Sequence, residues 1–161
     1  MPQPTVELPK DVVTSTFRHR VPFFDTDAMG IVHHANYVRY LELARVHLLE
    51  EHDQPYEAYI AQDRHFAVTR CEVYYAGPAR FGDELDIVVW VKRVGGASVE
   101  IAYRIECRGT LVVTAETAHA MVDSEGRPRR IPRERRQNLA RLAGGATSRI
   151  QPGAEPKGEN T

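Results

Sequence analysis

The stretch that decides the fold runs from Ser98 to Arg108 and reads SVEIAYRIECR. Apolar residues alternate in it with mostly polar ones. The apolar face would hold Val99, Ile101, Tyr103, Ile105 and Cys107. A period of two is that of a β-strand, in which successive side chains point to opposite faces. One apolar and one largely polar face are typical of an antiparallel sheet that rests on a core by one side.

Four further segments predict the rest of the sheet. The expected strands are Val12–Val21, Phe66–Tyr75, Asp83–Arg93 and Leu111–Asp123. Each is rich in β-branched or aromatic residues, and turn residues such as Gly77-Pro78, Gly95-Gly96 and Gly109-Thr110 separate the later strands. In Asp83–Arg93 the apolar set Leu85, Ile87, Val89 and Val91 alternates with Asp86, Val88, Trp90 and Lys92.

One helix is predicted between the first strand and the second. Over Tyr37–Glu51 the period changes, and one face carries Tyr37, Leu41, Ala44 and Leu48 at spacings of four, three and four. Tyr40, Leu43 and Val46 widen this apolar stripe, so we expect a well-buried helix. Asn36 is the expected N-cap, because a short side-chain oxygen there can accept from an early helical N–H. A shorter helix is expected over Pro132–Leu142.

The order of one strand, one helix and four strands predicts an α+β domain, an antiparallel sheet with its helix on one face. The length of 161 residues fits one domain. We expect a flexible leader over residues 1–11, a folded domain over 12–143 and a disordered tail over 144–161. A single helix cannot cover a five-stranded sheet, so self-association is expected.

Composition and charge argue against several classes of function. The formal net charge is −1, which argues against electrostatic capture of nucleic acid. The basic stretch 127–136 is broken by prolines and is interpreted as solvated surface. Cys71 and Cys107 are expected to be reduced thiols. No run reaches the roughly 18 to 20 apolar residues that span a bilayer, and residues 1–11 lack a secretory h-region, so a soluble cytoplasmic protein is expected.

The loop Asp25–Tyr37 is the densest group of reactive residues. Two carboxylates, a glycine, two histidines and a helix start occur in 13 residues. A helix N-terminus offers unpaired N–H groups that can hold an oxyanion, and a nearby carboxylate can act as nucleophile or base. Asp25 and Asp27 could instead shape the turn through Asx hydrogen bonds.

Other reactive residues have structural explanations. Adjacent histidines lack the spacing of known metal sites, so no metal is expected at His33 and His34. Glu42 and Arg45 are three apart on the helix, where an ion pair is expected, and His119 is interpreted as a structural histidine. There is no G-x-S-x-G elbow, no phosphate-binding loop and no dinucleotide fingerprint.

The run Phe24–Tyr37, continued by Arg39–Glu42 and Ala44-Arg45, resembles the hotdog-fold acyl-CoA thioesterases. It is most similar to the branch that contains the 4-hydroxybenzoyl-CoA thioesterase and the YbgC-like enzymes, over about Phe17 to Leu139. The shared pattern is D-x-D-x-x-G-x-V-x-[HY]-x-N-Y. The resemblance implies a five-stranded antiparallel sheet wrapped around one long central helix, and hydrolysis of acyl-CoA thioesters to free acid and CoA.

The resemblance also implies roles for single residues. Asp27 would be the catalytic carboxylate, and the backbone N–H of His34 would bind the thioester carbonyl, with the His34 side chain a candidate to orient water or the carboxylate. The expected substrate-binding residues are Gly30, Val32, His33, Asn36, Tyr37 and Ser98. Family members join their sheets in dimers or tetramers and form active sites between subunits. No cofactor is expected, since CoA is part of the substrate.

One departure from the family leaves the contacts to CoA open. The arginines that precede the serine in the 4-hydroxybenzoyl-CoA thioesterase, where they help to bind CoA phosphates, are Gly95 and Gly96 here. Lys92, Arg93 or C-terminal arginines are the candidates to replace them. The alternatives to the acyl-CoA thioesterase are a thioesterase that acts on an acyl-carrier protein and a non-catalytic acyl-CoA binding module on the same fold.

Overall fold

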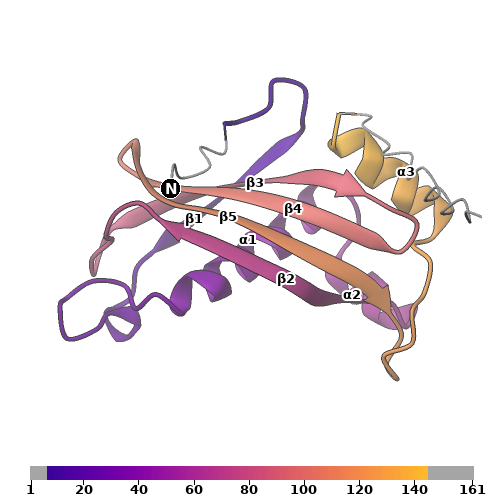
Figure 1. Cartoon of the computed structure of the whole chain (residues 1–161), viewed down its shortest axis with the longest axis horizontal. Coiled ribbons are helices and arrows are strands. Elements are labelled where there is room, and N and C mark those ends of the chain that lie inside the picture. Colours follow the sequence, from indigo (N-terminus) through magenta and orange to yellow (C-terminus); the bar gives the residue numbers. More distant parts are fainter. Residues whose placement is uncertain (1–6, 145–161) are drawn as a thin grey trace, which may run out of the picture.

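A computed structural model describes residues 7–144 of the chain. The elements follow one another along the chain as Figure 1 shows. They are β1 (Thr14–Arg20), the short 3-10 helix η1 (Phe23–Asp25), α1 (Asn36–His52), α2 (Tyr56–Ala61), β2 (His65–Tyr75), β3 (Glu84–Val94), β4 (Ser98–Cys107), β5 (Thr110–Val122) and α3 (Arg133–Leu142). The predicted strands match to within two residues at each end.

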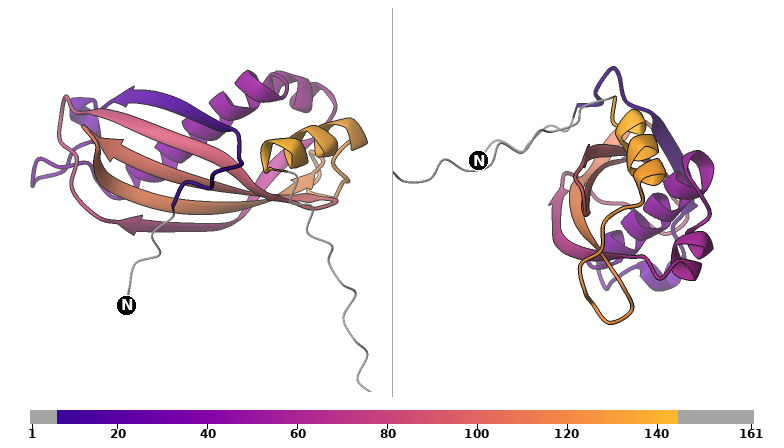
Figure 2. Two further views of the ribbon diagram at one scale, coloured as in Figure 1. Left: turned by 90° about the horizontal axis from the view of Figure 1, so that it is seen from above. Right: turned by 90° about the vertical axis from the view of Figure 1, so that its right-hand side faces the viewer.

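The five strands form one sheet in the order β1-β3-β4-β5-β2, with every pair antiparallel. Short turns join β3 to β4 and β4 to β5, whereas β1 and β2 are the two edges. Seen from its end, the sheet curls around α1 (Figure 2). The predicted fold class, an antiparallel sheet wrapped around one long helix, is confirmed.

The core lies between α1 and the concave face of the sheet. On β4 the predicted alternation is confirmed, since Val99, Ile101, Tyr103 and Ile105 are all buried. The opposite face is less polar than the alternation alone predicts. Trp90 of β3 and Ala102 of β4 stand opposite each other in register and are both buried.

Three predictions for α1 are wrong. Leu43 is 44% exposed instead of widening the buried stripe. Asn36 is the first helical residue and not the N-cap, because its side-chain Nδ2 donates to the Asp25 carbonyl at 2.9 Å and so fastens the loop. Within residues 7–144, Glu42 and Arg45 form no ion pair. Glu42 is exposed, whereas Arg45 is only 6% exposed and lies over the Tyr56 ring.

The helix α3 closes one end of the domain. Its Leu139 and Leu142 are buried, and the Leu142 carbonyl accepts from the Val13 N–H at 2.9 Å, which joins α3 to the chain entering β1. Cys71 and Cys107 are free thiols. Within the described residues no helix is both long and apolar enough to cross a membrane. Most of the predicted leader and all of the predicted tail beyond Gly144 lie outside the described residues.

Candidate active site

The loop between η1 and α1 folds as a small hairpin. Thr26 and Val32 form an antiparallel bridge, and inside it the Asp27 N–H donates to the Ile31 carbonyl at 2.8 Å. The turn closes at Gly30, whose φ of +75° is a left-handed conformation that glycine adopts without strain. The Val32 N–H donates to the Ala79 carbonyl, so the hairpin is fixed to the segment between β2 and β3.

Asp27 stands at the rim of this hairpin with a half-buried side chain. Its Oδ1 accepts a hydrogen bond from the Met29 N–H at 2.8 Å, which is the Asx turn that the simpler interpretation expects. Its Oδ2 accepts no hydrogen bond from the described part of the chain. The turn therefore orients the carboxylate and leaves one oxygen available for chemistry.

Asp25 lies at the base of the loop and is only 3% exposed. Its Oδ2 accepts from the Tyr40 hydroxyl at 2.6 Å, and its Oδ1 lies 3.5 Å from Arg39 Nη1. Burial and the Asp25 carboxylate both raise the pKa of Tyr40, so the phenol stays a donor. The Asp25 carbonyl accepts from the His33 N–H and from Asn36 Nδ2, each at 2.9 Å. Asp25 thus fastens the loop to the start of α1.

The two histidines stand just before α1 and stack at 4.3 Å between ring centroids. The His33 Nδ1 accepts from the Ala35 N–H at 3.1 Å, which stabilises the turn that leads into α1. The His34 N–H donates to no acceptor among residues 7–144, while the His34 carbonyl accepts from the Tyr75 hydroxyl at 3.0 Å. An unpaired N–H at a helix start can bind an oxygen that carries developing negative charge.

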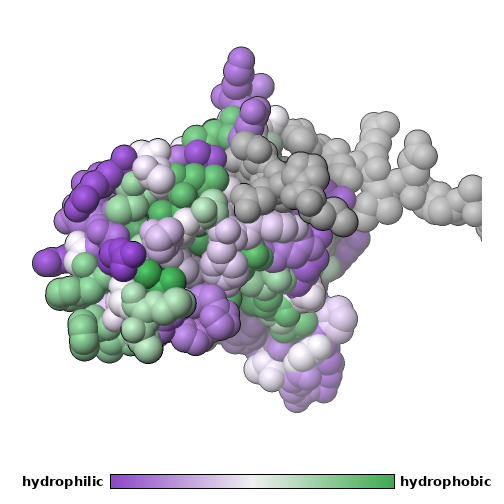
Figure 3. Space-filling model, turned by 60° about the vertical axis from the view of Figure 1, so that its left-hand side comes forward, coloured by the Kyte–Doolittle hydropathy of each residue, from purple (hydrophilic) through white to green (hydrophobic). Residues whose placement is uncertain are grey.

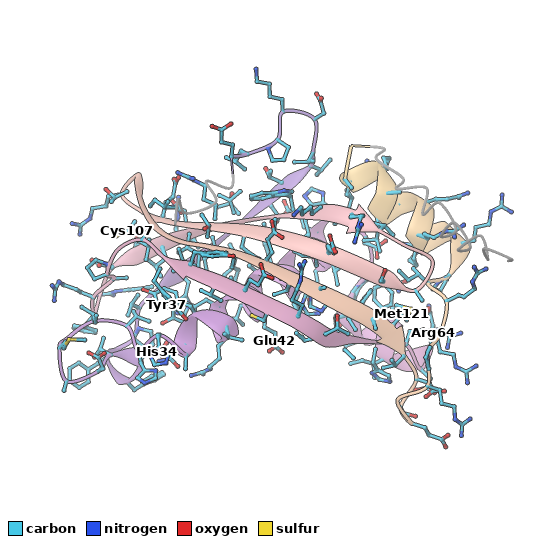
Figure 4. All side chains as sticks on the ribbon, viewed as in Figure 1. His34, Tyr37, Glu42, Arg64, Cys107 and Met121 are labelled. Carbon is cyan, nitrogen blue, oxygen red and sulfur yellow. The ribbon has the colours of Figure 1, made fainter. Side chains whose placement is uncertain are left out.

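A pocket of about 490 Å³ brings several of these residues together. Its walls are Asp27, Met29, Ile31, Val32, His34, Tyr37, Tyr75, Ala76, Gly77 and Pro78. Figure 4 shows His34 and Tyr37 at one end of the molecule, with Met121 and Arg64 at the other. Burial raises the pKa of Tyr37 to about 12, so its hydroxyl stays neutral near pH 7. The pocket therefore offers apolar walls, one carboxylate and one helix start.

The predicted site residues of the loop and the start of α1 divide into two groups. Asp27, Val32, His34 and Tyr37 line the pocket. Gly30, His33 and Asn36 shape and hold the loop instead. The sequence did not identify Tyr75 and the Gly77-Pro78 turn as pocket residues. Their position at the end of a predicted strand, and in the turn that follows it, was the signal that could have suggested them.

Ser98 lies apart from this pocket, at the start of β4, where its carbonyl accepts from the Gly95 N–H at 2.8 Å. Of the candidate cations near it, Lys92 pairs with Glu116 and Arg93 with Glu100, each at 2.7 Å. Arg130 makes no ion pair with a described residue, and its Nη2 would lie 3.6 Å from a Cβ added at Gly96. The glycine turn thus has an arginine from the C-terminal segment beside it.

His119 is buried in β5, where the sequence predicted a structural histidine, but its Nδ1 has no hydrogen-bond partner in the described residues. Its Nε2 lies 2.8 Å from the Thr117 hydroxyl, which lies 2.8 Å from the Tyr103 hydroxyl. Burial, with a smaller contribution from Arg45, lowers the pKa of His119 to about 3, so the ring is neutral at pH 7. It lines neither the pocket nor the loop. Across the described ranges, no three His, Cys, Asp or Glu side chains gather to hold a metal ion.

Comparisons with known proteins identify the family and the fold of the chain. A family model described as the thioesterase-like superfamily matches residues 21–141. The chain belongs to this superfamily. It is 36% identical to the acyl-CoA thioester hydrolase YbgC of Escherichia coli O6:H1 over 124 residues, which cover 74% of this chain and 92% of that protein. The predicted family and the prediction of a thioesterase enzyme are confirmed.

Solved structures show the same fold. A hypothetical protein from Thermus thermophilus, TT1821, superposes with a TM-score of 0.77 at 32% identity, covering 81% of this chain and 98% of that one. A thioesterase from the same species, solved with coenzyme A and Zn, gives a TM-score of 0.72 at 26% identity, covering 84% of this chain and 98% of that one.

Proposed function

We propose that this enzyme hydrolyses acyl-CoA thioesters in the pocket beside Asp27, with the N–H of His34 holding the thioester oxygen. One observation carries the proposal: a carboxylate with an available oxygen and an unpaired N–H at a helix start occur together in the short loop that lines one apolar pocket. The identity to a YbgC acyl-CoA thioester hydrolase supports the choice of CoA thioesters.

Two routes follow from the position of the Asp27 carboxylate. In the first, its oxygen adds to the carbonyl carbon, the C–S bond breaks, and CoA leaves as a thiolate that takes up a proton. Water then hydrolyses the resulting anhydride. In the second, Asp27 takes a proton from water, the hydroxide adds, and the proton returns to the departing sulfur. The negative charge on the carbonyl oxygen is held at the helix start in both routes.

The pocket walls suggest how the acyl group is held. Tyr37 and Tyr75 lie with ring centroids 5.6 Å apart, and Ile31, Val32 and Pro78 add apolar surface. Such walls bind an apolar or aromatic acyl group through burial, whereas the loop orients the thioester. The family implies that sheets pair between subunits. We propose that β2 is the strand that pairs, because it is an edge of the sheet and ends at the pocket residue Tyr75.

In such a homodimer, Ser98 of the partner subunit and Arg130 of the partner subunit are the proposed contacts to CoA phosphates. The proposal is supported by the free guanidinium of Arg130 beside the glycine turn. Arginine suits phosphate because it donates two parallel hydrogen bonds. The cytoplasm remains the proposed location.

The test is release of free thiol from short, medium, long and aromatic acyl-CoAs. Wild type should turn over at least one class, and Asp27→Asn should lose about 100-fold or more in kcat, because an essential nucleophile or base is removed. Asp11→Asn, which changes an exposed aspartate outside the pocket, is the matched control. If the protein hydrolyses only carrier-bound acyl groups, its substrate is an acyl-carrier protein thioester and not a CoA thioester. If it binds acyl-CoA without turnover, the proposed mechanism is overturned.

A further inference from the structure

The hydroxyl of Tyr75 has no role in the mechanism above, where only the ring of this residue serves as a pocket wall. Tyr75 ends β2, and its hydroxyl donates to the His34 carbonyl at 3.0 Å from 41 residues away in sequence. Within residues 7–144 no other side chain bonds to the His34 carbonyl. The bond therefore joins the far wall of the pocket to the residue whose N–H is proposed to hold the thioester oxygen.

Two peptide groups meet at the Cα atom of His34, and both are held by hydrogen bonds. In the first, which joins His33 to His34, the carbonyl accepts from the Asn36 N–H at 2.9 Å. The N–H of His34 belongs to the same peptide and points the opposite way, because the peptide is trans. In the second, which leads to Ala35, the carbonyl accepts from Tyr75 and the N–H donates to the His33 Nδ1 at 3.1 Å. The unpaired N–H thus lies beside a peptide that is held at both ends.

These bonds fix the direction of the unpaired N–H. A peptide group reorients by rotation about the Cα atoms on its two sides, so a fixed neighbouring peptide limits its movement. Without the Tyr75 hydroxyl, the second peptide would keep only its bond to the ring of His33, an exposed residue. A donor contributes most to catalysis when it is already aimed at the place where charge develops. Removing the hydroxyl should therefore slow the reaction, although the hydroxyl does not touch the reacting atoms.

The loop needs this support because it stands at an exposed end of the molecule. His33, His34 and Ala35 are all exposed. Figure 3 shows hydrophobic surface at the end of the molecule that carries the loop. Backbone with few buried contacts opens locally at little cost in free energy. A hydrogen bond from a fixed element opposes such opening.

The strand β2 supplies that fixed element. It pairs with β5 up to its last residue, where Tyr75 stands opposite Val113. The Tyr75 ring packs edge-on against the buried ring of Tyr37 at 5.6 Å and against the ring of His34 at 6.4 Å between centroids. Partial burial raises the pKa of the Tyr75 hydroxyl, so it keeps the proton that it donates. A group mounted on a strand holds its partner more precisely than one on a loop.

We propose that Tyr75 is a positioning residue of the reaction: its hydroxyl holds the peptide that follows His34 and so aims the His34 N–H at the thioester oxygen. The inference rests on the proposed hydrolysis in this pocket. The two roles of Tyr75 can be separated, because phenylalanine keeps the ring that forms the wall and lacks the hydroxyl.

The test is steady-state release of free thiol by Tyr75→Phe, with the acyl-CoA that wild type hydrolyses fastest. kcat should fall about tenfold, because the donor remains and only its aim is lost. KM should stay within about twofold, because the ring still lines the pocket. Tyr75→Leu removes the ring as well and should raise KM in addition. Tyr74→Phe is the matched control on the other face of β2, where the hydroxyl lies 3.4 Å from Glu72, and should change neither constant.

A second readout does not depend on turnover. The order parameters of the His34 and Ala35 N–H groups from ¹⁵N relaxation should fall from about 0.85, the value of rigid backbone, toward about 0.6 in Tyr75→Phe and stay unchanged in Tyr74→Phe. The role is overturned if Tyr75→Phe keeps wild-type kcat, if it changes KM alone, or if its order parameters equal those of wild type. If wild type hydrolyses no acyl-CoA, the proposed function fails and this role fails with it. An active wild type with an equally active Tyr75→Phe overturns this role alone.

Discussion

Asp25 at the base of the loop and Asp27 at its rim are two residues apart, yet their surroundings differ completely. Asp25 is buried, with one oxygen bonded to the Tyr40 hydroxyl and the other beside Arg39. Asp27 is half-buried in a pocket wall, and a single backbone N–H holds one of its oxygens. The same residue type therefore serves structure in one place and is available for chemistry in the other, because donors and access decide the role.

The largest expected effect is on stability and comes from removing the buried carboxylate of Asp25. Asp25→Ala leaves the buried Tyr40 hydroxyl without its acceptor and should lower the free energy of unfolding by about 3 kcal/mol. Urea unfolding measures it. Adding Tyr40→Phe removes the stranded donor, so the double variant should lose less than the sum of the two single ones. Additive losses would show that the hydrogen bond contributes little.

The pH dependence of stability tests the same distinction at another buried polar group, the ring of His119. The pKa of His119 is lowered to about 3 in the folded state, against 6.5 for a free histidine, so its contribution is full above pH 6.5 and is lost as the pH falls toward 3. Between pH 7 and pH 5 wild type should lose about 2 kcal/mol through this group. Urea unfolding of His119→Gln, which does not titrate, should show a flatter pH dependence. Equal slopes would contradict a neutral buried ring.

The smallest effect is expected at His34, at the proposed catalytic end of the loop. His34→Ala keeps the backbone N–H and removes only the ring that stacks on His33. If the amide and not the ring holds the thioester oxygen, kcat should fall less than about tenfold, well below the effect of losing an oxyanion donor. Steady-state thiol release measures it. A loss as large as that of Asp27→Asn would assign the role to the imidazole.

Periodicity predicted the elements well because each depends on residues close in sequence. The alternation in β4 and the spacing of four and three in α1 carry this information, and the strand ends agree to within two residues. The loop was predicted to be the candidate site because its reactive residues are also neighbours in sequence. The far wall of the pocket shows the limit: Tyr75 reaches His34 from 41 residues away, a contact that no local pattern reveals.

The failures have the same physical origin. The spacing of Glu42 and Arg45 allows an ion pair, but Arg45 is buried against Tyr56 while Glu42 faces outward. Leu43 satisfies the helical stripe and is nevertheless exposed, since it lines an open hollow between α1 and β1 instead of the core. Asn36 has the composition of an N-cap and is used to hold the Asp25 carbonyl. Tertiary contacts decided all three.

The most direct test measures kcat and the free energy of unfolding for Asp27→Asn and Asp25→Ala under one set of conditions. We predict that Asp27→Asn loses about 100-fold or more in kcat while its stability changes by less than about 0.5 kcal/mol. Asp25→Ala should lose stability and keep the larger share of kcat. The assignment is contradicted if folded Asp27→Asn retains wild-type kcat, or if Asp25→Ala is the slower enzyme of the two.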